Sequence, residues 1–219
     1  MPGVQGSAGR TQLERRTRSR SALLEAAARG LSIYGYANLS LERVAHEAGY
    51  TRGALYHQFA DKEALALAVV GWVEETWQAE VGHLLTAGGD PVQTLMAVAR
   101  GHAVYCRREI APVLMTLRVE FTGQDHPIGR AMEQGVDRLL ADCTDLIATG
   151  RASGVIPPGP PPGDLALAVL GALESVAIQL AGRAPYDVEL TERAVRGLLG
   201  LPPQAAPADT ETSPDQEIP

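Results

Sequence analysis

The sequence predicts an all-α protein of about nine helices, in which an N-terminal three-helix head is followed by a larger helical body. Residues 39–62 read as two short helices joined by a glycine-containing turn, and the segments around them repeat apolar residues at three- and four-residue spacing. Helix N-cap residues such as Ser40, Asp61 and Asp90 open several of these segments. The 219 residues, 45% of them hydrophobic, suffice for one large domain or two small ones.

The chain begins with a segment that differs in composition from the rest. We expect residues 1–12 to be a disordered arm, because their first part is made largely of Gly, Pro and Ser. Residues 13–34 should form the first helix, which ends at Gly35. This helix is expected to bury the inward faces of the next two and to fix the angle at which they cross.

The next two helices form a helix-turn-helix. One face of the first is apolar and consists of Leu41, Val44, Ala45 and Ala48. Ser40 can cap this helix and Gly49 can end it. In the second helix Leu55 and Phe59, four residues apart, point inward, so the outer face is available for contact.

The run LYHQFADKEAL, from Leu55 to Leu65, resembles the signature of TetR-family transcriptional regulators. In that family the pattern L-Y-x-H-F-x-x-K-E-x-L closes the recognition helix and opens the next one, and here Gln58 stands where the family usually carries His. Ala45 and Gly49 occupy the small and glycine positions of the general helix-turn-helix pattern. The resemblance is strong over roughly residues 17–75. It implies a DNA-binding head and a helical body that takes a small-molecule effector.

Carried over position by position, the resemblance also implies which residues contact double-stranded operator DNA. Those expected to face the major groove are Arg52, Gly53, Tyr56 and His57. Those expected to hold phosphates and set the register are Ser40, Thr51 and Lys62. Arg52 is the expected reader of guanine, because a guanidinium can pair with two acceptors of that base.

The net charge of −7 is unevenly distributed along the chain. Between Arg10 and Lys62 there are nine basic and five acidic residues, which give this part +4 and leave −11 for the remainder. A basic head attracts phosphates, while an acidic body discourages nonspecific adhesion. The arginine-rich run from Arg15 to Arg20 is either a solvated stretch or an arm that contacts phosphates or a groove.

The body is expected to begin with a connector helix at 62–85, capped by Asp61. Helices at 91–108, 112–123 and 127–153 should follow, each with apolar residues at helical spacing. The run PPGPPPG at 157–163 is expected to be a stiff, non-helical linker.

The last two helices are predicted at 164–181, capped by Asp164, and at 188–201. The first is apolar nearly all round and therefore needs cover on more than one side. A second copy of the chain is the simplest cover, which predicts a homodimer held by a four-helix bundle. The predicted domains are 13–60 for DNA binding and 61–201 for effector binding and dimerisation, and 202–219 is an expected disordered tail.

An effector can lower DNA affinity only by favouring a conformation in which the two heads no longer fit, so its pocket must touch the connector helix. The candidate lining residues are Trp72, His102, Tyr105, Met115, Arg118, Phe121 and Met132. Each also fits ordinary core packing. The acidic body favours a neutral or cationic effector, whereas a buried Arg118 that Glu120 does not pair would favour an anion.

Two other functions remain possible: a regulator whose body is controlled by a protein partner, and an enzyme that has borrowed the fold. His102 and Cys106 are four residues apart and could form a nucleophile pair or half a metal site, but no third group follows in a recognisable spacing. We therefore expect no enzymatic activity, metal or cofactor. Cys106 and Cys143 should be buried, reduced thiols. The chain has no apolar window of membrane-spanning length and no signal-peptide core, so we expect a cytoplasmic protein without membrane association.

Overall fold

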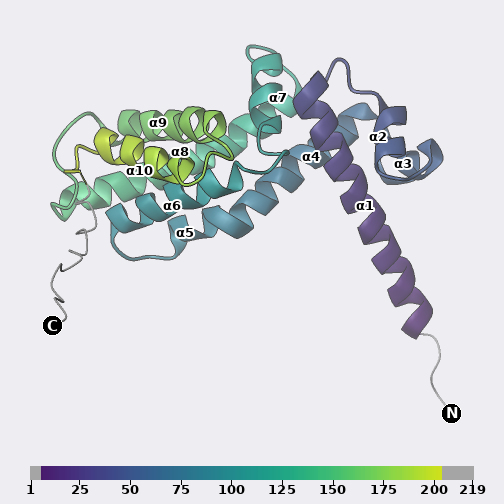
Figure 1. The fold of residues 1–219 in the computed structure, drawn as a ribbon, viewed down its shortest axis with the longest axis horizontal. Helices are drawn as coiled ribbons and strands as arrows, with labels where there is room; N and C mark the ends of the chain where they lie inside the picture. The colour runs from purple at the N-terminus through teal and green to yellow at the C-terminus, as the bar shows by residue number, and fades with distance from the viewer. Residues whose placement is uncertain (1–5, 204–219) are drawn as a thin grey trace, which may run out of the picture.

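The structure is a computed structural model that describes the backbone of residues 6–203 and the side chains from Glu14 onward. Over these residues the chain is all-helical, without strands, as predicted, and its elements join into nine continuous helices (Figure 1). The elements are α1 (Gly6–Tyr34), α2 (Leu41–Glu47), α3 (Arg52–Gln58), α4 (Lys62–Trp77), η1 (Gln78–Gly82), α5 (His83–Thr86), α6 (Pro91–Tyr105), α7 (Val113–Phe121), α8 (Pro127–Ala152), α9 (Pro162–Ala172), η2 (Leu173–Ala177) and α10 (Tyr186–Leu198). No helix between residues 6 and 203 is both long and apolar enough to cross a bilayer.

The head consists of α1, α2 and α3, and its local signals act as the sequence predicts. The Ser40 hydroxyl caps α2 by accepting from the backbone N–H of Arg43 at 3.3 Å, and Gly49 ends the helix in the left-handed region at φ +75°. α1 begins earlier than expected, at Gly6. The helix therefore extends into the segment that was predicted to be a disordered arm. No proline follows the second residue in this segment, so a helix that is nucleated further along the chain can extend back through it.

The buried side chains form two main clusters that do not follow the predicted boundary between residues 60 and 61. The first joins the head to the N-terminal part of α4, to α7 and to the start of α8, with Leu31, Leu65, Leu117 and Ile128 among its fully buried members. The second lies in the body, where α5, α6, α8, α9 and α10 pack together. α7 therefore packs as part of the head's core, although it follows the head by about 50 residues in the chain.

The connector predicted at 62–85 is one continuous rod, because α4, η1 and α5 follow without interruption and only the π-helical turn η1 changes the hydrogen-bond register. The start of α9 differs from the prediction. α9 begins at Pro162, within the run expected to be a linker, and Asp164 lies in its first turn instead of capping it. Proline is allowed at the first helical position, where its missing N–H would have no partner. From residue 204 on, the predicted tail lies outside the residues that the structure describes.

An ion pair between a buried carboxylate and an exposed arginine links α6 to α10. The Asp187 side chain is 0% exposed and accepts from Nε and Nη2 of Arg107 at 2.7 and 3.0 Å. The hydrogen bonds from Arg107 hold the pKa of Asp187 below its ordinary value, so the carboxylate stays charged in the core. This pair joins the end of α6 to the start of α10 and so holds the last helix against the bundle.

Candidate nucleic-acid interface and effector cleft

One face of α3 packs against the core of the head, and the opposite face is exposed to solvent. Leu55 and Phe59 are buried in the head's core, as predicted. The Thr51 hydroxyl caps the helix by accepting from the N–H of Ala54 at 3.2 Å. This anchoring leaves the outward side chains of α3 on a rigid, well-defined surface.

The four residues predicted to face a DNA groove are all exposed on α3: Arg52, Gly53, Tyr56 and His57. The Arg52 guanidinium lies 5.5 Å from the ring centroid of Tyr56 and donates to its hydroxyl at 3.4 Å. That hydrogen bond raises the pKa of Arg52 above its ordinary value. An added Cβ at Gly53 would meet only the Thr51 hydroxyl, at 3.9 Å, so the fold of the head does not require glycine there.

The three residues predicted to hold phosphates have different surroundings. The hydroxyls of Ser40 and Thr51 accept as helix caps on exposed residues, and each still has its own hydrogen to donate. Lys62 is half-buried, and its ammonium group donates to the carbonyl of Ala37 at 2.8 Å and lies 4.8 Å from the Tyr36 ring. The Lys62 side chain is therefore directed onto the loop between α1 and α2.

The same loop is also bound by α7. The Glu120 carboxylate accepts from the backbone N–H of Tyr36 at 2.6 Å and of Ala37 at 2.7 Å. The Tyr36 ring packs edge-on against Phe121, with centroids 5.3 Å apart, and both rings contact His126. Sequence reasoning considered Glu120 only as a possible partner of Arg118, and its role here depends on contacts more than 80 residues apart.

The seven predicted effector-binding residues do not line one pocket. Phe121, Met132 and Arg118 lie in one cleft of about 130 Å³ between the end of α7 and the start of α8. The other residues of this cleft are Thr122, Gly129, Glu133, Val136 and Asp137. Trp72 lines a separate, open groove of about 450 Å³ between α1 and α4.

His102 and Tyr105 lie elsewhere, with their polar atoms engaged inside the protein. His102 Nδ1 accepts from the Trp77 indole N–H at 3.0 Å, and burial lowers the pKa of this imidazole to about 4. The Tyr105 hydroxyl donates to the carbonyl of Val73 at 3.2 Å. Met115 is half-buried and lines neither the cleft nor the groove. Only three of the seven candidates are therefore brought together.

Core packing also accounts for His102 and Cys106, the pair considered as a nucleophile and its base. Cys106 Sγ lies 3.4 Å from His102 Nε2, but burial raises the pKa of the thiol to about 12, so it stays protonated and unreactive. Cys143 is likewise buried and free, as predicted. Within residues 6–203 no cluster of three or more His, Cys, Asp or Glu side chains could hold a metal ion.

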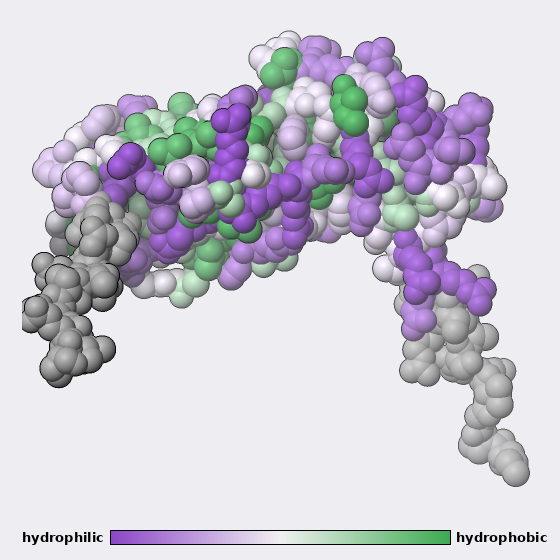
Figure 2. All heavy atoms as spheres, viewed as in Figure 1, coloured by the Kyte–Doolittle hydropathy of each residue, from purple (hydrophilic) through white to green (hydrophobic). Residues whose placement is uncertain are grey.

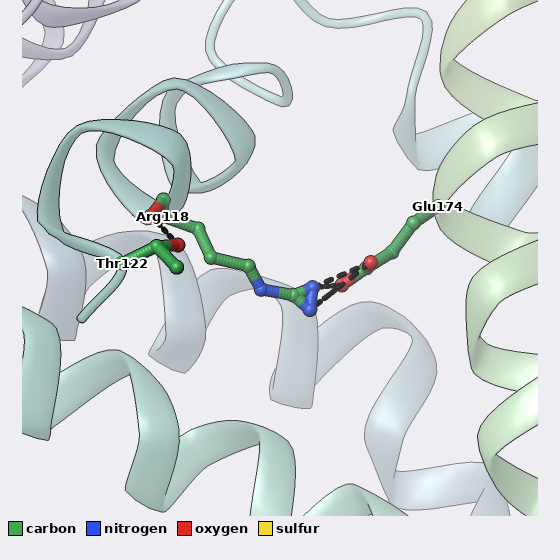
Figure 3. Close-up of polar contacts among 3 residues, drawn as sticks. All are labelled: Arg118, Thr122 and Glu174. Carbon is green, nitrogen blue, oxygen red and sulfur yellow. Dashed lines mark hydrogen bonds and ion pairs between the residues drawn. The ribbon is translucent and has the colours of Figure 1, made fainter.

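Arg118 pairs with a residue that the sequence did not suggest. Its guanidinium spans the gap from α7 to η2, where Nη1 and Nη2 contact the Glu174 carboxylate at 2.6 and 3.0 Å (Figure 3). Glu120, in contrast, is occupied by the loop between α1 and α2. Glu120 thus leaves Arg118 unpaired, but Arg118 is not buried and the Glu174 carboxylate neutralises it, so the structure gives no reason to favour an anionic effector.

The N-terminal part of the chain matches a known family. The model for "Bacterial regulatory proteins, tetR family" matches residues 23–69. The A-factor receptor protein of Streptomyces griseus is 29% identical over 126 residues, which make up 53% of this chain and 44% of that protein. The HTH-type transcriptional repressor AcnR of Corynebacterium glutamicum is 42% identical over 53 residues, 24% of this chain and 28% of AcnR. The chain thus spans less than half the length of these two relatives.

Solved structures resemble most of the helical arrangement, including head and body. AibR in complex with isovaleryl coenzyme A and operator DNA aligns with a TM-score of 0.67 at 20% identity, over 83% of this chain and 96% of AibR. A TetR transcriptional regulator from Chloroflexus aurantiacus J-10-FL aligns with a TM-score of 0.69 at 22% identity, over 85% of this chain and 95% of its own. At these identities the similarity shows a shared fold of head and body.

Proposed function

Because this chain belongs to the tetR family of bacterial regulatory proteins, we propose that it is a homodimeric transcriptional repressor that a small molecule releases from its operator. The observation that carries the proposal is the outer face of α3, where Arg52, Tyr56 and His57 stand exposed on a helix that is buried and capped from behind. A short, rigid helix with one polar face free is suited to the major groove, which is wide enough to admit it.

In the proposed complex each predicted DNA contact has a separate role. Arg52 turns from Tyr56 to the acceptor edge of a guanine, and Gly53 lets the backbone of α3 approach the groove closely. The capping hydroxyls of Ser40 and Thr51 donate to phosphate oxygens. Lys62 keeps one hydrogen on the Ala37 carbonyl and directs another donor to a phosphate.

The cleft between α7 and α8 is the proposed effector site, with Phe121, Met132 and Val136 as its apolar surface. Its rim carries Glu133 and Asp137, while Arg118 is neutralised by Glu174. This charge balance supports a neutral or cationic effector. A volume of about 130 Å³ lies well below the usual range for drug-sized ligands, so the effector is compact or the cleft widens as it binds.

The proposed dimer interface is the exposed apolar face of α9, packed against its copy together with α10. Leu167 is 58% exposed, and Figure 2 shows hydrophobic residues at the surface over α9. A Cβ added at Gly171 would meet no atom within 4 Å, so the surface there is open to a second helix. Dimerisation would bury this face and set the spacing between the two heads.

Selection of bound sequences from random DNA tests the assignment of the head. We expect a two-fold symmetric site with half-sites roughly 34–36 Å apart. Arg52→Ala should cost about 1–3 kcal/mol of binding free energy and relax the preference at one position. Lys62→Met should weaken all sequences alike and lower the salt dependence. Failure of the wild-type protein to enrich any sequence would overturn the proposal.

A thermal-shift screen of small molecules tests the cleft. True effectors should raise the melting temperature and release the selected DNA, and they should do neither after Val136→Trp fills the cleft from α8. Val136 is preferred to Phe121 for this test because Phe121 also contacts Tyr36 of the head. Because the cleft is small, regulation of the body by a protein partner remains the second candidate function. That function would be favoured if effective ligands were insensitive to every cleft residue or if none were found.

A further inference from the structure

An open groove of about 450 Å³ lies where α1 passes α4 (Figure 1). Each wall is a single helix face, since the lining residues recur at three- and four-residue spacing on both helices. They include Arg16, Arg20 and Leu24 on α1 and Ala68, Trp72 and Glu75 on α4. The groove is more than three times as large as the cleft of about 130 Å³ between α7 and α8, and its volume lies within the usual range of ligand pockets.

The groove combines an apolar surface with a charged rim. The buried Leu24 and the half-buried Trp72 supply apolar surface. Arg16, Arg20 and Glu75 are exposed and give the rim two positive charges and one negative charge. Among the side chains that the structure describes, neither of these arginines forms an ion pair with a carboxylate. A net charge of +1 beside an indole ring is complementary to an aromatic monoanion.

Arg20 links this groove to the recognition helix. Its guanidinium lies 4.8 Å from the ring centroid of Phe59, the C-cap residue of α3. A guanidinium that forms hydrogen bonds with a carboxylate is held more strongly than one that lies over a ring face. An anion in the groove would therefore draw Arg20 away from Phe59 and remove one of the contacts at the end of α3.

We propose that the groove between α1 and α4 binds a small aromatic monoanion, and that its occupation loosens the end of α3. The carboxylate of the ligand pairs with Arg16 and Arg20, and its ring lies against Trp72. This site differs from the proposed effector cleft in the charge it prefers, because the cleft keeps two carboxylates on its rim after Glu174 has neutralised Arg118. The consequence for operator binding rests on the proposed function of the head, whereas the binding of the anion does not.

The probes are 2-naphthoate and 2-naphthamide, which have nearly the same shape but differ in charge. Isothermal titration calorimetry at low salt should show roughly tenfold tighter binding of 2-naphthoate, because the neutral amide cannot form charge-assisted pairs with the guanidinium groups. The protein has two tryptophans, whose indole N–H signals can be followed by NMR and assigned with Trp72→Phe. The acid should shift the signal of Trp72 and not that of Trp77, which donates to His102 in the body.

Arg16→Glu should weaken the binding of 2-naphthoate roughly tenfold, since it replaces an attractive charge by a repulsive one. Arg15→Glu is the matched control, because it makes the same change at the neighbouring residue, which does not line the groove, and it should weaken binding by no more than about twofold. Both arginines are exposed, so both variants should unfold at the wild-type temperature. Equal losses in the two variants, equal affinities for the two probes or an unmoved Trp72 signal would overturn the proposal.

Operator titrations test the effect on α3. Saturating 2-naphthoate should lower the affinity of the wild-type protein for the selected DNA roughly two- to fivefold, which corresponds to the loss of one exposed cation–π contact. Arg16→Glu should respond only at roughly tenfold higher concentrations of the acid. Bound 2-naphthoate that leaves operator affinity unchanged would overturn the link through Arg20. A wild-type protein that bound 2-naphthoate but no operator would refute the proposed function of the head and leave the ligand site standing, which is a distinct outcome.

Discussion

The Glu120 carboxylate accepts the backbone N–H of Tyr36 at 2.6 Å, which ties α7 to the loop that leads into the helix-turn-helix. Two residues before Glu120, Arg118 binds Glu174 of η2. α7 is therefore held at one side to the proposed dimerisation helix and at the other to the head. The proposed effector cleft is lined by Phe121, the residue after Glu120, so a ligand there would act directly on the element that joins the two parts.

Glu120→Ala should loosen this connection. It removes the acceptor of two backbone N–H groups, and hydrogen bonds to a charged group contribute about 1.5–3 kcal/mol each before relaxation and solvent access reduce the effect. We expect the free energy of unfolding to fall by about 1–3 kcal/mol and the amides of Tyr36 and Ala37 to exchange faster with solvent. Denaturant titration and hydrogen exchange measure the two effects.

The matched control for Glu120 is Glu109→Ala, at an exposed carboxylate in the turn after α6. It should leave both measurements unchanged. Equal exchange rates for Tyr36 and Ala37 in wild type and Glu120→Ala would mean that the loop is held by packing alone, through Tyr36 and Phe121.

Gly53→Ala separates the needs of the fold from those of DNA binding. The helix has room for the methyl group, and alanine is favoured over glycine in helices by up to about 1 kcal/mol, so the variant should be as stable as wild type or slightly more stable. Its affinity for the selected operator should fall, because the methyl group holds α3 away from the groove. Thermal unfolding and DNA titration should thus move in opposite directions.

Gly71→Ala, in the middle of α4, serves as the control for Gly53 because its added Cβ would meet no atom within 4 Å, so this helix likewise has room for the methyl group. This variant should gain similar stability and keep wild-type DNA affinity. Unchanged operator affinity in Gly53→Ala would argue against close approach of the α3 backbone to DNA.

His102 should make stability depend on pH. In the folded protein its pKa is about 4, lowered by burial, against 6.5 ordinarily, so between these values the unfolded chain takes up a proton that the native protein does not. Stability should therefore fall as the pH drops through this window, by up to roughly 3 kcal/mol from this residue. His102→Gln, which keeps an acceptor for the Trp77 N–H, should lose that component.

Urea titrations above pH 6.5 and near pH 4 measure the component due to His102. His83→Gln, at an exposed histidine in α5, should retain the full wild-type dependence on pH. A pH dependence that survives His102→Gln would have to come from other groups.

The dimer should depend on the exposed face of α9. Leu167→Glu/Gly171→Glu places two charges on this face without a clash inside the protomer, so the protein should fold but sediment as a monomer. Operator affinity should collapse, because two linked heads are needed to span both half-sites. Val119→Glu, at a 77% exposed apolar residue of α7, should leave the dimer intact. A wild-type protein that sediments as a stable monomer would exclude this interface.

Much of the head could be predicted because its signals are local. Ser40 and Asp61 cap the helices that follow them, and Gly49 takes the positive φ that ends α2. Reliance on local signals also led to one error, the start of α9. Asp164 is a residue type that caps helices as well as Asp61 does, but it lies inside α9, because Pro162 can occupy the first position of the helix. Residues at three- and four-residue spacing share a helix face in any context, so Leu55 and Phe59 were correctly predicted to be buried.

The sequence by itself determined the helical class, the order of the helices and the exposed face of α3, because caps, turns and periodicity act within a few residues of one another. Only the tertiary structure decided which charged groups meet. Glu120 contacts the loop at Tyr36, Arg118 reaches Glu174, and Lys62 turns back to the carbonyl of Ala37. The tertiary structure also decided which of the candidate effector residues lie together. Phe121 and Met132 share a cleft, whereas His102 lies elsewhere and bonds the Trp77 indole. These choices depend on how whole helices pack, and an apolar stripe looks the same in sequence whether it fills a core or lines a cleft.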